Sequence, residues 1–302
     1  MEYFITSHKG ELAAIITAIC WTFTSLSFEA AGKKVGSMPV NIIRLVIAIV
    51  LLGTLQFFRF GYFFPQGADA FQWLWLSISG LVGFVIGDML LFQAFVVIGA
   101  RISMLVMALS PPLAALFGWV ILGEELTLAH VIGMLITMLG ISIVILGKPI
   151  KGKRIEMKYP VKGVLLAFGG ATGQGLGLVL SKYGMGDYDP ASATMIRVIA
   201  GTIGFALLFI FTGHWPKVIG ALKHGIALVF ISIGAFFGPF LGVSFSLFAV
   251  QNTTTGVAST IMAIVPVLII PPAVLLFKEK VTGKEVIGAT LAVLGVFVLF
   301  WF

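Results

Sequence analysis

The sequence predicts an all-α membrane protein with ten transmembrane helices, arranged as two inverted repeats of five helices each. Three observations support this. Apolar residues make up 59% of the 302 residues and charged residues only 10%, against roughly 25% charged residues in globular domains. The apolar residues gather in runs of about 20, the length of a helix that crosses a bilayer. Finally, the second half of the chain repeats the first.

The apolar runs define the predicted spans. In the first half they lie at residues 11–31, 38–58, 71–97, 102–122 and 128–147. In the second half they lie at residues 161–182, 189–213, 224–251, 256–277 and 283–302. The segment 148–162 between the halves is polar and basic. We therefore predict a first repeat at 1–147, a basic linker at 148–162 and a second repeat at 163–302.

The two halves align at a nearly constant offset. From Ser77 to Leu146 the residues match those 155 positions later, with 16 identities over 70 ungapped positions. Upstream the offset is 153, so that Arg44 matches Arg197. Because each half holds an odd number of predicted spans, the second half enters the membrane from the opposite side. Inverted repeats of this kind are common in secondary transporters.

Small residues recur every fourth position in the third predicted span and in its repeat counterpart. They are Ser79, Gly83 and Gly87 in the first half and Gly234, Gly238 and Gly242 in the second. This spacing places them on one helix face, where they allow close helix packing. Prolines at matched or nearby places predict kinks, which could serve as gates of a cavity. These are Pro111, Pro112, Pro239 and Pro266.

Asp88 is the ionisable residue that stands deepest in a predicted span. Ionisable groups inside a membrane are costly, which makes them candidates for function. Asp88 could bind a cationic substrate or carry a coupling proton, or it could pair with Arg44; both readings stay open. Its repeat counterpart is Val243, so the repeat does not require the acid. Arg44 and Arg197 are expected to extend their side chains towards the membrane interface.

Residues on shared helix faces, or at matched places in the two halves, are the candidates for lining a substrate cavity. Aromatic and methionine side chains suit an adaptable apolar wall. The candidates are Trp21, Ser25, Phe84, Asp88, Phe92, Met107, Gln174, Leu178 and Met262.

The sequence offers no constellation for catalysis. The four histidines lack the spacing of metal ligands, the single Cys20 belongs to no motif, and no phosphate-binding loop or nucleophile motif is present. We therefore predict neither an enzyme nor a metal or cofactor site. A lipid-modifying membrane enzyme and a structural subunit of a membrane complex are the rival classes, and the duplication favours neither.

The repeated pattern resembles a known family. In the first half it comprises Pro111, Gly123-Glu124, Thr127, Gly133 and Leu139-Gly140. In the second half it comprises Pro266, Lys278-Glu279, Thr282, Gly288 and Leu294-Gly295. It resembles the drug/metabolite transporter superfamily, specifically the EamA type. The resemblance implies a secondary carrier, often an exporter of amino acids, other metabolites or drugs, with a cavity between the repeats. A nucleotide-sugar or lipid-headgroup carrier is the alternative.

The expected partners are a small-molecule substrate and the lipid bilayer, without nucleic acid, and a monomer is compatible with this layout. The expected location is the cytoplasmic membrane of a prokaryote. Two indications of orientation disagree. Fourteen basic residues fall on the side opposite the termini and three on the side of the termini, which places the termini outside the cytoplasm. The resemblance implies cytoplasmic termini instead.

Overall fold

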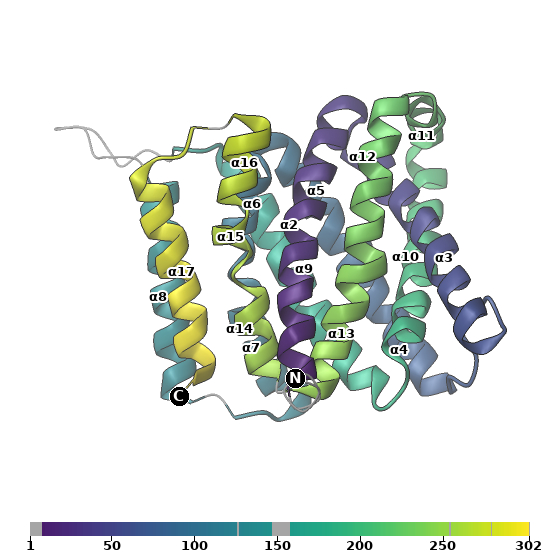
Figure 1. Ribbon diagram of the computed structural model, residues 1–302, viewed down its shortest axis with the longest axis horizontal. Coiled ribbons are helices and arrows are strands. Elements are labelled where there is room, and N and C mark those ends of the chain that lie inside the picture. The colour runs from purple at the N-terminus through teal and green to yellow at the C-terminus, as the bar shows by residue number, and fades with distance from the viewer. Residues whose placement is uncertain (1–7, 126, 147–157, 254, 279, 302) are drawn as a thin grey trace.

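The structure, a computed structural model, describes residues 8–125, 127–146, 158–253, 255–278 and 280–301. All the secondary-structure elements within these ranges are helices, most of which run roughly side by side in one bundle (Figure 1). Residues 148–157 of the predicted linker and Glu279 of the repeated pattern lie outside the described residues.

The helices of the first half follow the predicted spans to within a few residues at their ends, and the third and fourth spans are subdivided. They are α2 (Lys9–Val35), α3 (Ser37–Phe60), α4 (Ala70–Gly80), η1 (Leu81–Gly87), α5 (Asp88–Ile98), α6 (Ala100–Met107), α7 (Ser110–Leu122) and α8 (Leu128–Ile145). The segments α4, η1 and α5 form one continuous helix, whose central part η1 is a π-helix.

The second half has a similar series, with the short helix α11 added and its fourth span divided into three helices in place of two. Its elements are α9 (Val161–Met185), α10 (Pro190–Thr212), α11 (Trp215–Leu222), α12 (Gly225–Ala235), η2 (Phe236–Gly242), α13 (Val243–Asn252), α14 (Thr255–Met262), α15 (Val265–Leu268), α16 (Ile270–Phe277) and α17 (Gly283–Trp301). The π-helix η2 stands 155 positions after η1, at the equivalent place in the repeat.

Among the described residues, eight helices are long and apolar enough to cross a membrane. The two remaining predicted spans, 256–277 and 283–302, correspond to the broken series α14–α16 and to α17, so ten spans stays a prediction. Large apolar side chains face outwards, including Phe211 at 85% and Phe58 at 81% exposure. Such a surface is stable when lipid covers it. The chain is therefore an integral membrane protein.

Helix ends follow local sequence signals. The Asp69 side chain accepts a hydrogen bond from the backbone N–H of Gln72 and caps α4. Thr127 caps α8 through the N–H of His130 in the same way. Gly123 ends α7 with φ of 68°, a left-handed conformation in which glycine lacks the steric cost of a side chain. These signals set where the chain turns between neighbouring helices.

Helices α8 and α17, the last of each repeat, pack against each other in a reciprocal manner. A Cβ atom added to Gly140 would lie 2.7 Å from the carbonyl oxygen of Gly288. The equivalent pair behaves alike, since a Cβ atom on Gly295 would lie 2.8 Å from the carbonyl oxygen of Gly133. The order of these contacts makes the two helices antiparallel. Reciprocal contacts between equivalent elements indicate an approximate two-fold axis, here perpendicular to the helices.

The same approximate two-fold symmetry relates the contacts at the centre of the bundle. Helix α9 crosses η1 where Gly83 faces Gly177, with a Cβ atom on Gly177 only 3.1 Å from the Gly83 Cα. In the equivalent contact, α2 crosses η2 where Gly238 faces Thr24, whose Cγ2 would lie 2.9 Å from a Cβ atom on Gly238. The small residues thus let the first helix of each repeat approach the third helix of the other. α2 and α9 therefore stand at the centre, between the two repeats.

Candidate functional site

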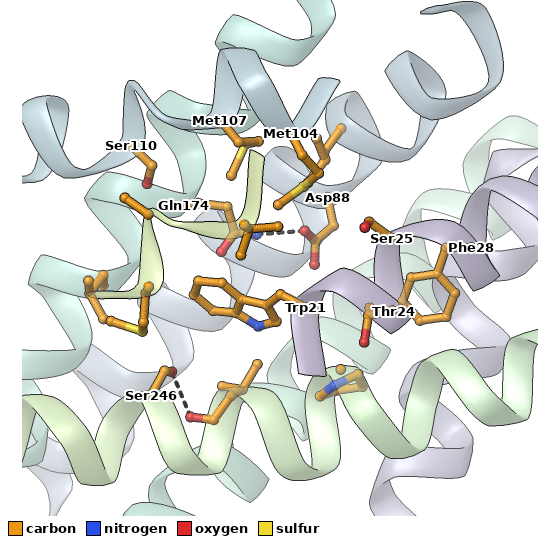
Figure 2. Close-up of a pocket in the computed structure, with 18 of the residues that line it drawn as sticks. Trp21, Thr24, Ser25, Phe28, Asp88, Met104, Met107, Ser110, Gln174 and Ser246 are labelled. Atoms are coloured by element: carbon orange, nitrogen blue, oxygen red, sulfur yellow. Dashed lines mark hydrogen bonds between the residues drawn. The ribbon is translucent and has the colours of Figure 1, made fainter. Parts of the chain in front are cut away.

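A cavity lies between the two repeats and is lined by residues from the middle parts of their long helices. Figure 2 shows part of its lining. The cavity has a volume of about 140 Å³, enough for roughly ten waters. Both repeats contribute to its wall, through α2, α3, η1, α5, α6 and α7 from the first and the equivalent α9, α10, η2, α13, α14 and α15 from the second. A shared central cavity is where inverted-repeat carriers bind their substrates.

All nine residues proposed from the sequence as cavity liners reach this wall: Trp21, Ser25, Phe84, Asp88, Phe92, Met107, Gln174, Leu178 and Met262. That any of them contacts a substrate stays a prediction. In Figure 2 the Trp21 ring lies across the cavity, between Gln174 on one side and Ser246 on the other. The wall is mostly apolar, with a few polar groups that could orient a ligand.

The face of α2 that turns to the cavity follows helical spacing. Trp21, Ser25 and Phe28 succeed one another at intervals of three or four residues, so their side chains project from one side of the helix. Trp21 is only half-buried, whereas Ser25 and Phe28 are buried. The opposite side of α2 carries the exposed Ile15 and Ile19.

The prolines stand at helix breaks beside the cavity. Pro111 lies in the first turn of α7, just after the chain leaves α6, and Pro266 lies in the first turn of α15, just after α14. Pro239 lies inside η2. These three line the cavity, while Pro112 does not. A gating role for any of them stays a prediction, but breaks at equivalent places give both repeats a point of bending.

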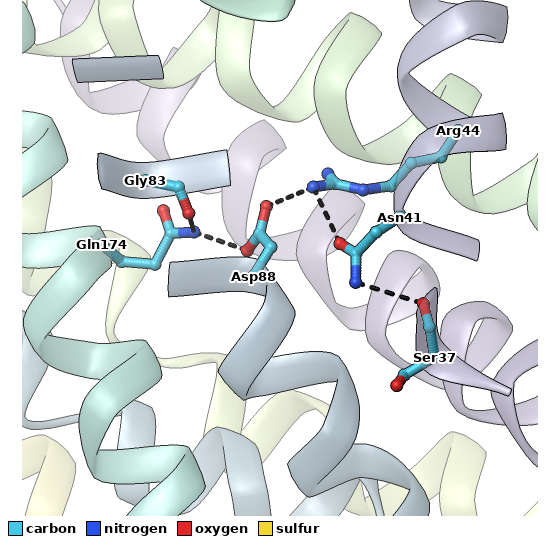
Figure 3. A network of polar contacts seen from close by, with 6 residues as sticks. All are labelled: Ser37, Asn41, Arg44, Gly83, Asp88 and Gln174. Atoms are coloured by element: carbon cyan, nitrogen blue, oxygen red, sulfur yellow. Dashed lines mark hydrogen bonds and ion pairs between the residues drawn. The ribbon is translucent and has the colours of Figure 1, made fainter. Parts of the chain in front are cut away.

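Asp88 is held in a polar network (Figure 3). Its Oδ2 accepts a hydrogen bond from Arg44 Nη2 at 2.5 Å, and its Oδ1 accepts one from Gln174 Nε2 at 2.5 Å. Gln174 also donates to the Gly83 carbonyl oxygen at 3.3 Å. Asn41 Oδ1 accepts a bond from Arg44 Nη2 at 3.4 Å. The Arg44 and Asp88 side chains are both buried, so this is an ion pair away from solvent.

Aromatic rings surround the Arg44 guanidinium. Its Cζ lies 4.6 Å from the ring centroid of Phe92, 5.4 Å from that of Phe84 and 5.6 Å from that of Phe28. Cations are attracted to ring faces, typically by about 0.5–2 kcal/mol. Ring faces and a carboxylate together stabilise a charge that burial alone would strongly disfavour.

The expectation that Arg44 and Arg197 extend to the membrane interface is wrong. The two residues are only 2% and 4% exposed, and both line the cavity. The physical reason for Arg44 is its partner Asp88, which lies inwards from it. The repeat could have indicated this burial, because arginines at equivalent positions of two inverted helices can both face the interior that the repeats share.

Three serines also line the cavity without having been expected from the sequence: Ser110, Ser246 and Ser259. Ser246 Oγ donates to the Val243 carbonyl oxygen at 2.8 Å. The buried Ser259 Oγ has no hydrogen-bond partner among the residues that the structure describes. Small hydroxyl residues are common packing residues in membrane helices, so the sequence alone did not distinguish these three.

A second polar cluster lies away from the cavity, at the start of α17. Glu285 Oε1 accepts hydrogen bonds from Lys158 Nζ at 2.6 Å and from the Tyr159 hydroxyl at 2.7 Å, and its Oε2 accepts one from Arg101 Nη1 at 2.7 Å. The bond to Glu285 raises the pKa of Lys158. These contacts join the chain before α9 to the start of α17. Within the described ranges, no three histidine, cysteine or acidic residues gather as a metal site would require.

Comparison with known proteins adds a family to this geometry. The model of the EamA-like transporter family matches residues 8–146 and again residues 161–301. The uncharacterized transporter YyaM of Bacillus subtilis is 26% identical over 282 residues, covering 91% of this chain and 88% of its own. An uncharacterized transporter of Clostridium kluyveri is 24% identical over 292 residues, covering 95% and 91%. A solved structure described only as that of a protein shares the fold, with a TM-score of 0.62, 21% identity and 96% coverage of both chains.

Proposed function

The chain belongs to the EamA-like transporter family, and we propose that it carries small organic metabolites across the membrane by alternating access through the central cavity. In this mechanism the two repeats rock against each other about the site they share. We propose export as the direction of net transport, and amino acids or drug-like compounds as the kinds of substrate.

The observation that carries this proposal is the position of the cavity. It lies midway along the helices and is walled by equivalent elements of both repeats. A movement that exchanges the conformations of the two repeats would therefore close the cavity towards one side and open it towards the other. The helix breaks at Pro111 and Pro266 supply matched points at which the spans could bend.

The size of the cavity supports a small substrate over a nucleotide sugar or a lipid headgroup. Space for roughly ten waters corresponds to a molecule with a similar number of non-hydrogen atoms. A nucleotide sugar is several times larger and would need a substantially wider conformation. The apolar wall of Trp21, Phe84, Met107 and Met262 further supports a substrate with an apolar body.

The driving force is proposed to be a proton gradient coupled through Asp88. This carboxylate lies inside the membrane and lines the cavity, which is where coupling groups of carriers occur. Protonation of Asp88 would remove its charge and release Arg44 from the ion pair. The pair could then exist in two states that accompany the two conformations of the repeats.

Flux measurements test the proposal. Purified protein in proteoliposomes should release a preloaded panel of labelled amino acids and small drug-like compounds faster than protein-free liposomes do, and an imposed pH gradient should change the rate. Met107→Trp, which fills the cavity, should abolish flux. Leu165→Trp, at a residue 63% exposed on the outside of α9, is the matched control and should retain it. Equal flux from the two variants would contradict transport through this cavity.

A further inference from the structure

Arg197 is a buried cation at the cavity wall. Asp88 attracts it electrostatically, but that carboxylate is paired with Arg44, so Arg197 has no ion-pair partner of its own among the described residues. It is 4% exposed, and its Nε has no hydrogen-bond partner. No hydrogen bond or ion pair joins it to another residue in the part of the chain that the structure describes. The Phe84 ring lies close to it, with its centroid 4.9 Å from the guanidinium carbon.

The structure holds Arg197 in place through its backbone and its neighbours. A Cβ atom on Gly80 would lie 2.3 Å from the Arg197 carbonyl oxygen, so α10 and the end of α4 are in direct contact there. A Cβ atom on Gly83 would lie 3.3 Å from Arg197 Nη2. The guanidinium therefore occupies space beside Gly83 that a larger residue would restrict. Its position at the cavity is defined by packing.

The repeat shows what Arg197 lacks. Its equivalent, Arg44, is neutralised by Asp88. The residue equivalent to Asp88 is Val243, which also lines the cavity but carries no charge. A single ring contact stabilises a buried ion far less than burial without an ionic partner destabilises it. The second repeat thus keeps the cation and has lost the internal anion.

The charges of the cavity wall do not balance. Among the described lining residues, Arg44 and Arg197 are cationic and Asp88 is anionic, which leaves one uncompensated positive charge. The charge of Asp88 is already compensated by Arg44, and Gln174 donates to its other oxygen, so a substrate ammonium group would have to compete with Arg44 for this carboxylate. The missing component of the site is therefore one negative charge.

We propose that Arg197 binds the carboxylate of a small monocarboxylate substrate whose apolar body lies against the aromatic and methionine side chains. This inference rests on the proposed function and specifies its substrate class. Guanidinium groups suit planar carboxylates, to which they donate two parallel hydrogen bonds. A phosphate monoester carries about −1.5 to −2 at neutral pH, more than the single uncompensated charge. Substrate binding supplies the anion that Val243 does not.

Binding to the full-length protein in detergent micelles tests this. Thermal-shift and calorimetric titrations should compare butyrate, hexanoate and benzoate with benzamide, benzylamine and phenyl phosphate. Wild-type protein should bind the carboxylates, bind phenyl phosphate more weakly, and ignore the amide and the amine. Arg197→Gln should weaken carboxylate binding by about 10- to 100-fold, as expected for loss of a charged hydrogen-bonding partner. Arg197→Lys, which keeps the charge, should retain part of it.

Two further variants make the test decisive. Val243→Asp restores the internal anion at the position equivalent to Asp88, and it should suppress carboxylate binding without loss of folding. Arg59→Gln is the control, since Arg59 pairs with Asp189 at 3.1 Å outside the cavity, and it should bind as the wild type does. If Arg197→Gln does not fold, Val243→Asp decides the matter.

The inference is overturned if the wild type binds no carboxylate, if benzamide binds as well as benzoate, or if Val243→Asp leaves binding unchanged. Transport remains separable from this result. Flux of neutral or cationic compounds without carboxylate binding would leave the carrier function standing and remove the carboxylate site. Carboxylate binding without any flux would leave the carboxylate site standing and remove the carrier function.

Discussion

At the scale of the residue, the Arg44–Asp88 pair is a buried ion pair in the otherwise mostly apolar wall of the cavity. The two charges are bound to each other, to Gln174 and to Asn41, and lie among phenylalanine rings. A buried pair of this kind adds little net stability, but breaking one side is expensive, by about 3–5 kcal/mol, since an unpaired ion stays behind. The pair therefore favours one arrangement of α3, α5 and α9 over looser alternatives.

Substitutions of Asp88 and Arg44 should therefore have non-additive effects on stability. Asp88→Asn should lower the melting temperature of the purified protein, because Arg44 is left uncompensated. The double variant Asp88→Asn with Arg44→Gln should recover a substantial part of the loss, because neither ion remains. A melting curve of each variant measures this. Strictly additive losses would mean that the two side chains do not act as a pair.

The same Asp88→Asn variant tests the proton coupling. An amide cannot carry the proton, so flux driven by a pH gradient should disappear in proteoliposomes, while exchange of labelled for unlabelled substrate continues. Retention of gradient-driven flux would remove Asp88 from the coupling mechanism and leave it as the structural partner of Arg44.

The sequence predicted the lining residues better than it predicted their chemistry. Helical spacing and the repeat offset identified Trp21, Ser25 and Met107, because both depend only on chain geometry. The burial of Arg197 was not predicted, because its distance from a helix end does not reveal which way the side chain turns. Its direction depends on the close approach of α10 to Gly80 and Gly83, which is a contact between residues over a hundred positions apart.

At the scale of the element, the two π-helices are the feature that sequence patterns did not reveal. η1 and η2 occupy equivalent positions and precede Asp88 and Val243. Pro239 lies inside η2, but the equivalent residue in η1 is Phe84, so proline is not their common cause. Both π-helices carry the glycines at which α9 and α2 cross. Widened helical turns of this kind often occur at functional sites, and here they bring Phe84 and Pro239 to the cavity wall.

The close crossing of α9 and η1 predicts a marked effect of added volume. A Cβ atom on Gly173 would lie 2.6 Å from the Gly87 Cα, a backbone atom that cannot turn aside. Gly173→Ala should therefore destabilise the protein by about 1–3 kcal/mol and lower its melting temperature. Gly220→Ala in α11 is the matched control, since nothing lies within 4 Å of its Cβ position. Equal melting temperatures of the two variants would contradict the packing described here.

Element boundaries were largely predictable, and the breaks within elements were less so. The span predicted at 71–97 is observed at Ala70–Ile98, because apolar length is written directly in the sequence. The span predicted at 256–277 is divided into α14, α15 and α16. Its prolines indicated bending, but how far the helix separates depends on what the freed backbone groups contact, which a sequence does not specify.

At the scale of the whole molecule, an approximate two-fold axis relates the two repeats. Contacts between α8 and α17, between α9 and η1, and between α2 and η2 occur in equivalent pairs. The start of α2 and the end of α17 lie at the same end of the bundle (Figure 1). The distribution of basic residues, fourteen on the other side against three on this one, predicts that this end faces away from the cytoplasm.

The symmetry is incomplete where the chemistry lies. Trp21 and Gln174 are equivalent positions with different side chains, and so are Asp88 and Val243. The shared backbone is compatible with the proposed exchange between two conformations, while the wall presents one distinct set of groups. In the proposed mechanism, duplication would provide the movement, and divergence between the copies would provide selectivity.

Alternating access requires the cavity to open in turn to the two sides of the membrane. Cys20 is the single cysteine, so a Cys20→Ala background allows one new cysteine to be followed. Ser246→Cys places a thiol on the cavity wall, and Leu165→Cys places a control thiol on the outer surface of α9. A membrane-impermeant thiol reagent is then added from one side or the other.

Ser246→Cys should react from both sides, a gradient or a transported compound should shift the ratio of the two rates, and Leu165→Cys should react from neither side. Reaction of Ser246→Cys from one side alone under every condition, or from neither side, would contradict alternating access.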